Sequence, residues 1–420
     1  MDYEDSRERQ YKNHQPAVQW ARSCYDLTSR PVGHLSRRPV LASYSGPDGG
    51  LACIERHSKP FELKELDVDF IDEDLVDSSP TSSSKEETTS LDRKDSGFSG
   101  DPVADTFGLC VRENSAVLVL ADGVNWGPKS RLASQCAVRG CMDYLNRCLY
   151  QEHGSRRMQN TQDIFVCLLR SFSAAHTLIL QEEGELTTLC AAVVCPVRHS
   201  SQFVVCACNV GDSLAYVYSP THGVREITQG SHDLTTSRDM RDALGALGPV
   251  EGPRPQLGNL TVSQTLVDPG DLILLCSDGV SDNLDPVVGR RARPSGSKGR
   301  LPSLAPMQRH QMALLQMEDL LQGAANAHQA CDRLVNFASK LTARKRAVLE
   351  DPSLYTAGTD FTAEDQRLRR RSVAGRLATL PGKLDHASVV AYTVASSAAR
   401  PSSRSHRRRQ PRAAQVESCL

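Results

Sequence analysis

From about residue 104 onward, the chain carries short apolar runs separated by polar turns, a pattern that predicts β-strands. Two of these runs, 107–111 and 116–121, flank a polar turn at 112–115. Six further strands are predicted at 188–194, 202–209, 214–218, 260–267, 271–276 and 387–394. Because Asp268-Pro269-Gly270 has good turn chemistry, we expect 260–267 to pair with 271–276 as a hairpin.

Two long stretches, 130–150 and 162–182, instead repeat apolar residues every three or four positions and predict amphipathic helices. A third helix is predicted over 310–345. The strands are rich in β-branched residues and are mixed with these helices without the regular alternation of βαβ units. The pattern therefore predicts an α+β fold with antiparallel sheets.

The two ends of the chain lack this pattern. Residues 1–103 are rich in Ser, Arg and acidic residues, and residues 395–420 are rich in Ser and Arg, so both are predicted to be disordered. A single domain is expected over 104–394, with basic polar inserts near 285–309 and 350–383. The hydrophobic content of 39% and the aromatic content of 5% agree with a chain that lies partly outside any core.

Charge and composition exclude several classes of protein. The 49 Lys and Arg residues balance 50 Asp and Glu residues, which argues against nucleic-acid or membrane-surface binding driven by bulk charge. No run approaches the ~20 apolar residues of a transmembrane helix, and the start of the chain has no secretory signal. The 14 cysteines form no CxxC pair, so we expect reduced, buried thiols in a cytoplasmic or nuclear protein. A monomer is expected.

Five aspartates occupy one kind of position, at an end of an apolar strand. Asp122 and Asp278 each end an apolar run, Asp212 follows one, and Asp105 and Asp385 each precede one. Carboxylates at strand ends can converge on one rim of a sheet pair, where Mg²⁺ or Mn²⁺ would find the oxygen ligands it prefers. Asp next to Gly is also ordinary turn chemistry, so the spacing alone leaves both interpretations open.

Taken together, an ordered series of short motifs resembles the metal-dependent protein phosphatase family of type 2C. The series reads Ala104-Asp105-Thr-Phe-Gly, Ala121-Asp122-Gly123, Leu186-Thr187-Thr188, Asn209-Val-Gly-Asp212-Ser213, Ala243-Leu-Gly, Pro269-Gly-Asp271, Cys276-Ser277-Asp278-Gly279 and Asp385-His386-Ala-Ser-Val-Val. The resemblance covers residues 104–394, with inserts between Asp282 and Asp385.

The resemblance implies two antiparallel sheets packed together between pairs of helices, with a binuclear Mg²⁺ or Mn²⁺ site at one edge. It implies that metal-bound water hydrolyses phosphoserine or phosphothreonine in phosphoprotein substrates, without a covalent enzyme intermediate. It places the metal ligands at Asp105, Asp122, Gly123 (through its backbone carbonyl), Asp278 and Asp385, and it places Asp282 and Asp212 near a third, more loosely held ion.

The sequence also departs from the family pattern. Ala104 stands where the family has an acidic residue, Gly100 where it has a phosphate-gripping arginine, Val124 where it often has a histidine, and His386 where it has an asparagine. Arg93 and Lys94 are out of register with the missing arginine. Two functions therefore remain open: a working phosphatase, and a pseudophosphatase scaffold that keeps the metal site with little activity.

The last residues, Ser418-Cys419-Leu420, carry the kind of sequence that a PDZ domain binds. A hydroxyl residue two places before an apolar C-terminal leucine suits the carboxylate nest and the pocket of a PDZ groove. Three loosely specified positions also match by chance in a solvated tail, so the two interpretations stand side by side.

Overall fold

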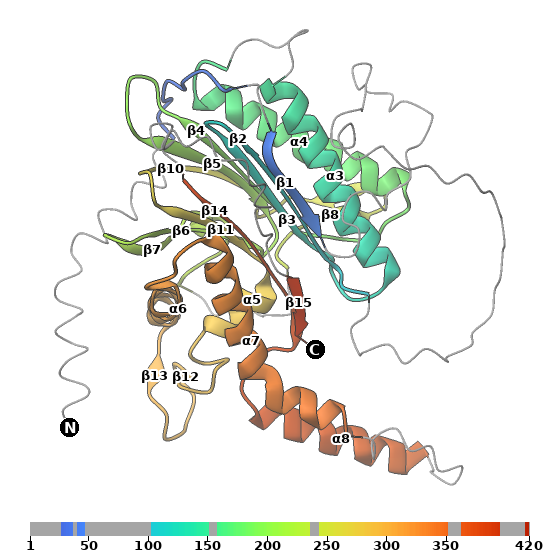
Figure 1. Cartoon of the computed structure of the whole chain (residues 1–420). Coiled ribbons are helices and arrows are strands. Elements are labelled where there is room, and N and C mark those ends of the chain that lie inside the picture. The colour runs from blue at the N-terminus through green and yellow to red at the C-terminus, as the bar shows by residue number, and fades with distance from the viewer. Residues whose placement is uncertain are drawn as a thin grey trace, which may run out of the picture.

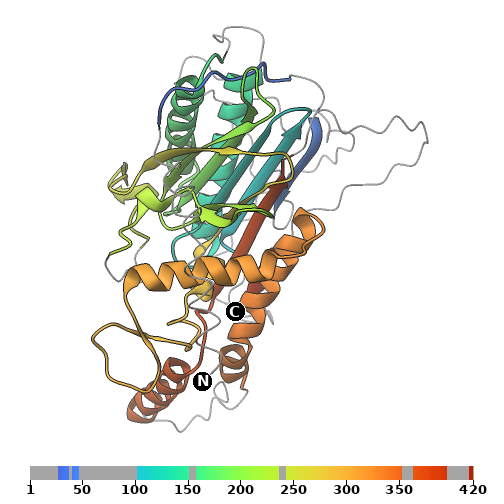
Figure 2. The same cartoon turned by 90° about the vertical axis from the view of Figure 1, so that its left-hand side faces the viewer.

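The computed structural model describes residues 27–36, 40–46, 102–150, 158–235, 243–351, 363–394 and 416–419. In these residues the chain forms four layers: two antiparallel sheets face each other, and helices cover the outer face of each sheet (Figures 1 and 2). The α+β class and the sandwich architecture predicted from the sequence are confirmed.

The first sheet has six strands in the order β1-β2-β3-β4-β5-β10. Their bounds are β1 Val40–Gly46, β2 Asp105–Arg112, β3 Ala116–Asp122, β4 Leu189–Pro196, β5 Phe203–Val210 and β10 Thr261–Val267. The central strands β3, β4 and β5 are buried almost throughout, because one face packs on helices and the other on the second sheet. Burial on both faces explains why these strands read as continuous apolar runs.

The second sheet has five strands in the order β15-β14-β11-β6-β7. Their bounds are β15 Val416–Cys419, β14 Asp385–Thr393, β11 Leu272–Cys276, β6 Leu214–Ser219 and β7 Gly223–Glu226. Two small ribbons stand apart, formed by β8 Ala246–Glu251 with β9 Arg254–Gln256 and by β12 Arg293–Pro294 with β13 Ser303–Leu304.

Helices α3 (Pro128–Tyr150) and α4 (Thr161–Gln181) cover the six-stranded sheet, as the spacing predicted. The start of α4 is fixed by a capping box in which Asn160 and Asp163 satisfy each other's backbone N–H groups. By length and composition α4 would also suffice to cross a membrane, but half of its apolar window is buried inside the molecule, as in a core helix. Three helices, α5 (Asp278–Leu284), α6 (Pro306–Leu321) and α7 (Ala327–Leu349), cover the other sheet, and α8 (Ala363–Thr379) extends beyond α7 (Figure 1).

Three hydrophobic clusters hold the layers together. One lies between α3, α4 and the six-stranded sheet, and a second lies between the two sheets. The third joins the five-stranded sheet to α5, α6 and α7. Each sheet therefore buries both of its faces, which leaves its strand ends as the place where polar groups can gather.

Two sequence predictions about pairing and helix length were wrong. The turn at Asp268–Asp271 forms, with the Asp271 N–H donating to the Asp268 carbonyl at 3.0 Å, but it carries the chain from one sheet to the other. β10 pairs with β5, and β11 pairs with β6 and β14, so the two strands make no hairpin. The helix predicted over 310–345 is divided into α6 and α7, because Gly323 adopts a positive φ of 70° and Asn326 caps a new helix.

Structure also appears where the sequence predicted disorder or polar loops. β1 lies within 1–103 and pairs with β2, and its exposure alternates along the strand in the way expected of a half-buried edge. β15 lies within 395–420 and pairs with β14. The insert near 350–383 contains α8, and the insert near 285–309 contains β12 and β13.

Candidate metal centre

One corner of the site is built by two neighbouring strands of the six-stranded sheet. Asp105 begins β2 and Asp122 ends β3, and the two residues are directly opposite each other in the antiparallel ladder. The Asp105 side chain is fully buried, with the Ser277 and Ser388 hydroxyls and the His386 ring near its carboxylate, and no lysine or arginine is paired with it among the described residues. A buried carboxylate is costly unless a cation balances its charge.

Gly123 follows Asp122 at a point where the backbone is tightly enclosed. A Cβ atom on this residue would lie 2.5 Å from the carbonyl oxygen of Ser130, so only glycine fits here. The Asp122 carbonyl accepts hydrogen bonds from the Thr188 N–H at 2.8 Å and the Thr187 hydroxyl at 2.9 Å. These contacts fix the direction in which the chain leaves β3.

The opposite corner comes from the second sheet. Asp278 is the first residue of α5, Asp282 lies one turn further along this helix, and Asp385 begins β14. The start of α5 lies directly on β14, because a Cβ on Gly279 would overlap the carbonyl oxygen of His386. The Ser277 N–H donates to Ser388 at 3.0 Å and completes this junction.

The two corners lie close together, because the N–H of Ala104, next to Asp105, donates to the ring of His386, next to Asp385, at 3.3 Å. Burial raises the pKa of Asp122 well above its usual value, and the charges of Asp105, Asp278, Asp385 and Asp212 raise it further. Burial likewise raises the pKa of Asp278, with Asp385 as the next cause. Asp212, in the turn between β5 and β6, is 5% exposed. The structure thus brings all the aspartates expected from the sequence to one rim of the sandwich.

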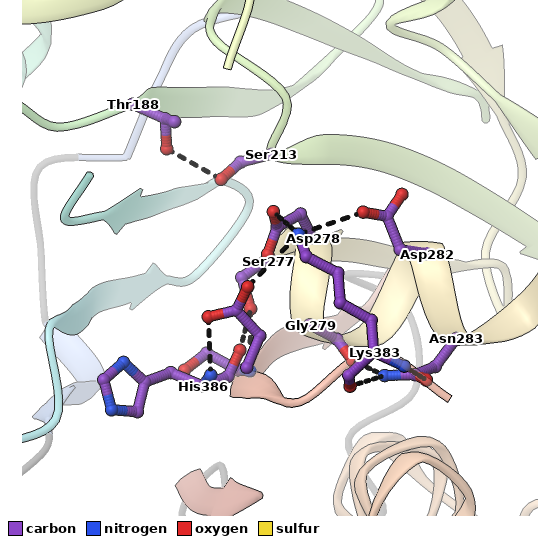
Figure 3. A network of polar contacts seen from close by, with 11 residues as sticks. Thr188, Ser213, Ser277, Asp278, Gly279, Asp282, Asn283, Lys383 and His386 are labelled. Atoms are coloured by element: carbon purple, nitrogen blue, oxygen red, sulfur yellow. Dashed lines mark hydrogen bonds and ion pairs between the residues drawn. The ribbon is translucent and has the colours of Figure 1, made fainter. Parts of the chain in front are cut away.

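A lysine that the sequence analysis did not single out lies among these carboxylates. The Lys383 ammonium donates to Asp278 and lies 3.1 Å from Asp282 (Figure 3). It also lies 3.1 Å from Asp385. Burial lowers the pKa of Lys383, but Asp282, Asp278 and Asp385 together outweigh burial and raise it. The only signal in the sequence was a basic residue two positions before Asp385, in Gly382-Lys383-Leu384-Asp385.

The Lys383 backbone is fixed to α5 by a buried asparagine. Asn283 is 1% exposed and donates to the Gly279 carbonyl at 2.7 Å and to the Lys383 carbonyl at 3.0 Å. The side-chain amide oxygen of Asn283 accepts a hydrogen bond from the Lys383 backbone N–H at 2.8 Å. The segment that carries the lysine is therefore tied to the same helix that carries Asp278 and Asp282.

The donor set suits a hard divalent cation, since every candidate side-chain ligand is a carboxylate. The fit is best at the first corner, where Asp105 lies opposite Asp122 on the neighbouring strand and no lysine or arginine is paired with Asp105 among the described residues. Across the described residues, no group of three His, Cys, Asp or Glu side chains is arranged to hold a metal ion. At the second corner, the carboxylates are arranged around the Lys383 ammonium instead.

Most of the residues that depart from the family pattern lie in the part of the chain that the structure describes. His386 is 1% exposed, and its Nδ1 accepts the Ala104 N–H at 3.3 Å, so it ties β14 to the entry of β2. The Val124 N–H donates to the Leu186 carbonyl at 2.9 Å. Arg93, Lys94 and Gly100, where the missing phosphate grip was considered, lie outside the described residues.

Comparison with known proteins identifies the family. A model of the protein phosphatase 2C family matches residues 98–318, and the chain belongs to this family. The match includes Asp105, Asp122, Asp212, Asp278 and Asp282. Lys383 and Asp385 lie beyond its end.

The chain is also similar to the PP2C-like domain-containing protein CG9801 of Drosophila melanogaster, with 36% identity over 404 residues. That alignment covers 70% of this chain and 57% of the fly protein, so the chain spans little more than half the length of this relative.

Among solved structures, the serine/threonine phosphatase PstP/Ppp of Mycobacterium tuberculosis is 18% identical, with a TM-score of 0.34, and covers 59% of this chain and 89% of its own. The photosystem II phosphatase PBCP is 15% identical, with a TM-score of 0.39, and covers 69% of this chain and 90% of its own. The family assignment rests on the sequence match over residues 98–318.

Proposed function

We propose that the protein is a metal-dependent phosphatase that removes phosphate from phosphoserine and phosphothreonine in proteins. The observation that carries this proposal is the convergence of Asp105, Asp122, Asp278 and Asp385, from two sheets and a helix start, on one rim of a protein phosphatase 2C domain. Mg²⁺ or Mn²⁺ is the proposed cofactor, since all the side-chain donors are carboxylates.

Divalent ions bound here would supply a water of lowered pKa and would neutralise charge on the phosphoryl oxygens. The chain's own part is to hold the ligands. The β2–β3 ladder sets Asp105 opposite Asp122, and the close approach of Ser130 fixes Gly123, whose carbonyl is the proposed backbone ligand. Asp212 adds negative charge from the β5–β6 turn, and Asp282 does so from α5.

The test is release of phosphate from phosphoserine and phosphothreonine peptides by the purified full chain in Mn²⁺ or Mg²⁺. We expect activity that is lost on adding a chelator and is lost in Asp122→Ala, while the control Asp268→Ala, at an exposed turn on another edge, keeps it. A wild-type rate no higher than that of Asp122→Ala, with several peptides and both metals, would contradict catalysis and leave the pseudophosphatase scaffold.

The location and assembly of the protein are also proposals. We propose a cytoplasmic or nuclear protein, because the eleven cysteines of the described residues are free and all but Cys148 are buried, which suits a reducing compartment. Imaging of the tagged protein tests this. We propose a monomer, which light scattering of the purified chain tests.

We further propose that the C-terminal residues bind a PDZ domain. The support is the sequence Ser418-Cys419-Leu420; because β15 pairs with β14 in this structure, the tail would have to leave that edge and add to the sheet edge of the PDZ domain. Adding one glycine after Leu420 moves the terminal carboxylate and should abolish capture by PDZ domains, while phosphatase activity is unchanged. Equal capture of both forms would remove the proposal.

A further inference from the structure

The second corner of the carboxylate cluster already contains a cation. Lys383 places its ammonium against three aspartates at once, and two of them, Asp278 and Asp385, are proposed metal ligands. An ammonium has three N–H donors, which is the number of carboxylates around it here. The side chain is 18% exposed, so this is an enclosed ion-pair cluster and not a surface salt bridge.

The position of this lysine is fixed by the surrounding structure. Asn283 makes reciprocal hydrogen bonds with the Lys383 backbone, at 2.8 and 3.0 Å. The preceding residue, Gly382, has a φ of 89°, donates its N–H to Val288 at 2.9 Å and accepts a hydrogen bond from Lys345. The lysine therefore enters the cluster from a segment held by both α5 and α7.

We propose that Lys383 acts as a built-in cation at the Asp278, Asp282 and Asp385 end of the cluster, so that the site takes up one divalent ion instead of two. That ion is held at the Asp105, Asp122 and Gly123 end. This inference rests on the proposed metal binding and changes its stoichiometry.

Charge accounts for the preference. A divalent ion entering the second corner would have to break three contacts of a paired, enclosed ammonium and then lie beside that positive charge, because Lys383 is only two residues from Asp385. At the first corner, no lysine or arginine is paired with Asp105 among the described residues, so an ion there gains carboxylate ligands without displacing an ammonium. One strong divalent position and one lysine-filled position follow from this difference.

The experiment is calorimetric titration of the metal-free full chain with Mn²⁺, with a matched pair of lysine variants. Lys383→Met keeps an unbranched side chain one atom shorter and removes its charge, and Lys340→Met is the control because Lys340 is exposed on α7. We expect one bound ion in the wild type, two in Lys383→Met and one in Lys340→Met. Two ions in the wild type would overturn the inference while leaving the proposed phosphatase intact.

A measurement on the wild type alone keeps the inference testable if Lys383→Met does not fold. With two equivalents of Mn²⁺, electron paramagnetic resonance should show isolated, uncoupled Mn²⁺ and one equivalent remaining free. The signal of a spin-coupled pair would refute the inference. The absence of bound Mn²⁺ in every form would overturn both the inference and the metal-dependent function, so the two failures are distinguishable.

Discussion

Replacing Asn283 with alanine should destabilise the protein by an amount that the hydrogen bonds of this side chain allow us to estimate. The side chain is 1% exposed and takes part in three hydrogen bonds, two as donor at 2.7 and 3.0 Å and one as acceptor at 2.8 Å. At about 1 kcal/mol each, their loss costs about 3 kcal/mol. Alanine's better helix propensity in α5 offsets about 0.5 kcal/mol.

The net loss in Asn283→Ala is therefore expected to be about 2.5 kcal/mol in the free energy of unfolding, measured by urea denaturation of the metal-free protein. Asn336→Ala is the control, since Asn336 is exposed on α7 and its replacement should change stability by less than about 0.5 kcal/mol. A loss in Asn283→Ala below about 1 kcal/mol would show that this asparagine does not hold the Lys383 segment on α5.

Three further changes test other parts of the structure. Arg225 on β7 is 2% exposed and joins the two sheets, because it donates to Thr265 at 2.9 Å and to the Leu266 carbonyl at 2.6 Å. Arg225→Met should therefore lower the free energy of unfolding by about 2 kcal/mol in urea denaturation, and an unchanged or higher value would contradict that role. Gly279→Ala should give a poorly soluble or strongly destabilised protein in solubility and urea-denaturation measurements, because its Cβ would lie 2.7 Å from the His386 carbonyl carbon. The control Gly375→Ala on α8 has open space around its Cβ and should behave like the wild type in both measurements. Burial lowers the pKa of His310, and the pKa of Glu226 is also lowered because His232 and His310 outweigh its burial, so both groups bind fewer protons in the folded state than in the unfolded state. The free energy of unfolding should therefore fall as the pH drops below about 6.5, and this fall between pH 7 and 5 should be weaker in His310→Leu.

The aspartates of the site were predictable because they sit where apolar strands begin and end. Asp122 follows six buried residues, and Asp105 begins a strand that is buried almost throughout, so the burial that defines the strands also locates the carboxylates. The ordered motifs then indicated which strand ends belong together. Local pattern and family resemblance were sufficient for this half of the site.

Lys383 was not predictable in the same way. A lysine beside an aspartate in a polar insert is usually solvated, and its partner Asp278 lies 105 positions away in the sequence. Only the folded chain shows that the two meet. The failed hairpin has the same origin: the turn at residues 268–271 is set by local residues, but the partners of β10 and β11 are set by which sheet each strand can join. Edge strands such as β1 carry too weak an alternation to stand out from a polar terminus.

The position of β14 has a consequence for the order in which the chain is made. Ser277 and His386 meet across 109 positions of sequence, and β14 lies beside β11 in the middle of its sheet. The six-stranded sheet, with Asp105 and Asp122, is complete once residue 267 has been synthesised. A chain that stops before Asp385 would keep the other five aspartates of the rim but would lack β14, and it would expose the edge of β11 to other strands. Chains truncated before Asp385 should therefore aggregate, and their aggregation should be detected before their loss of phosphatase activity can be measured.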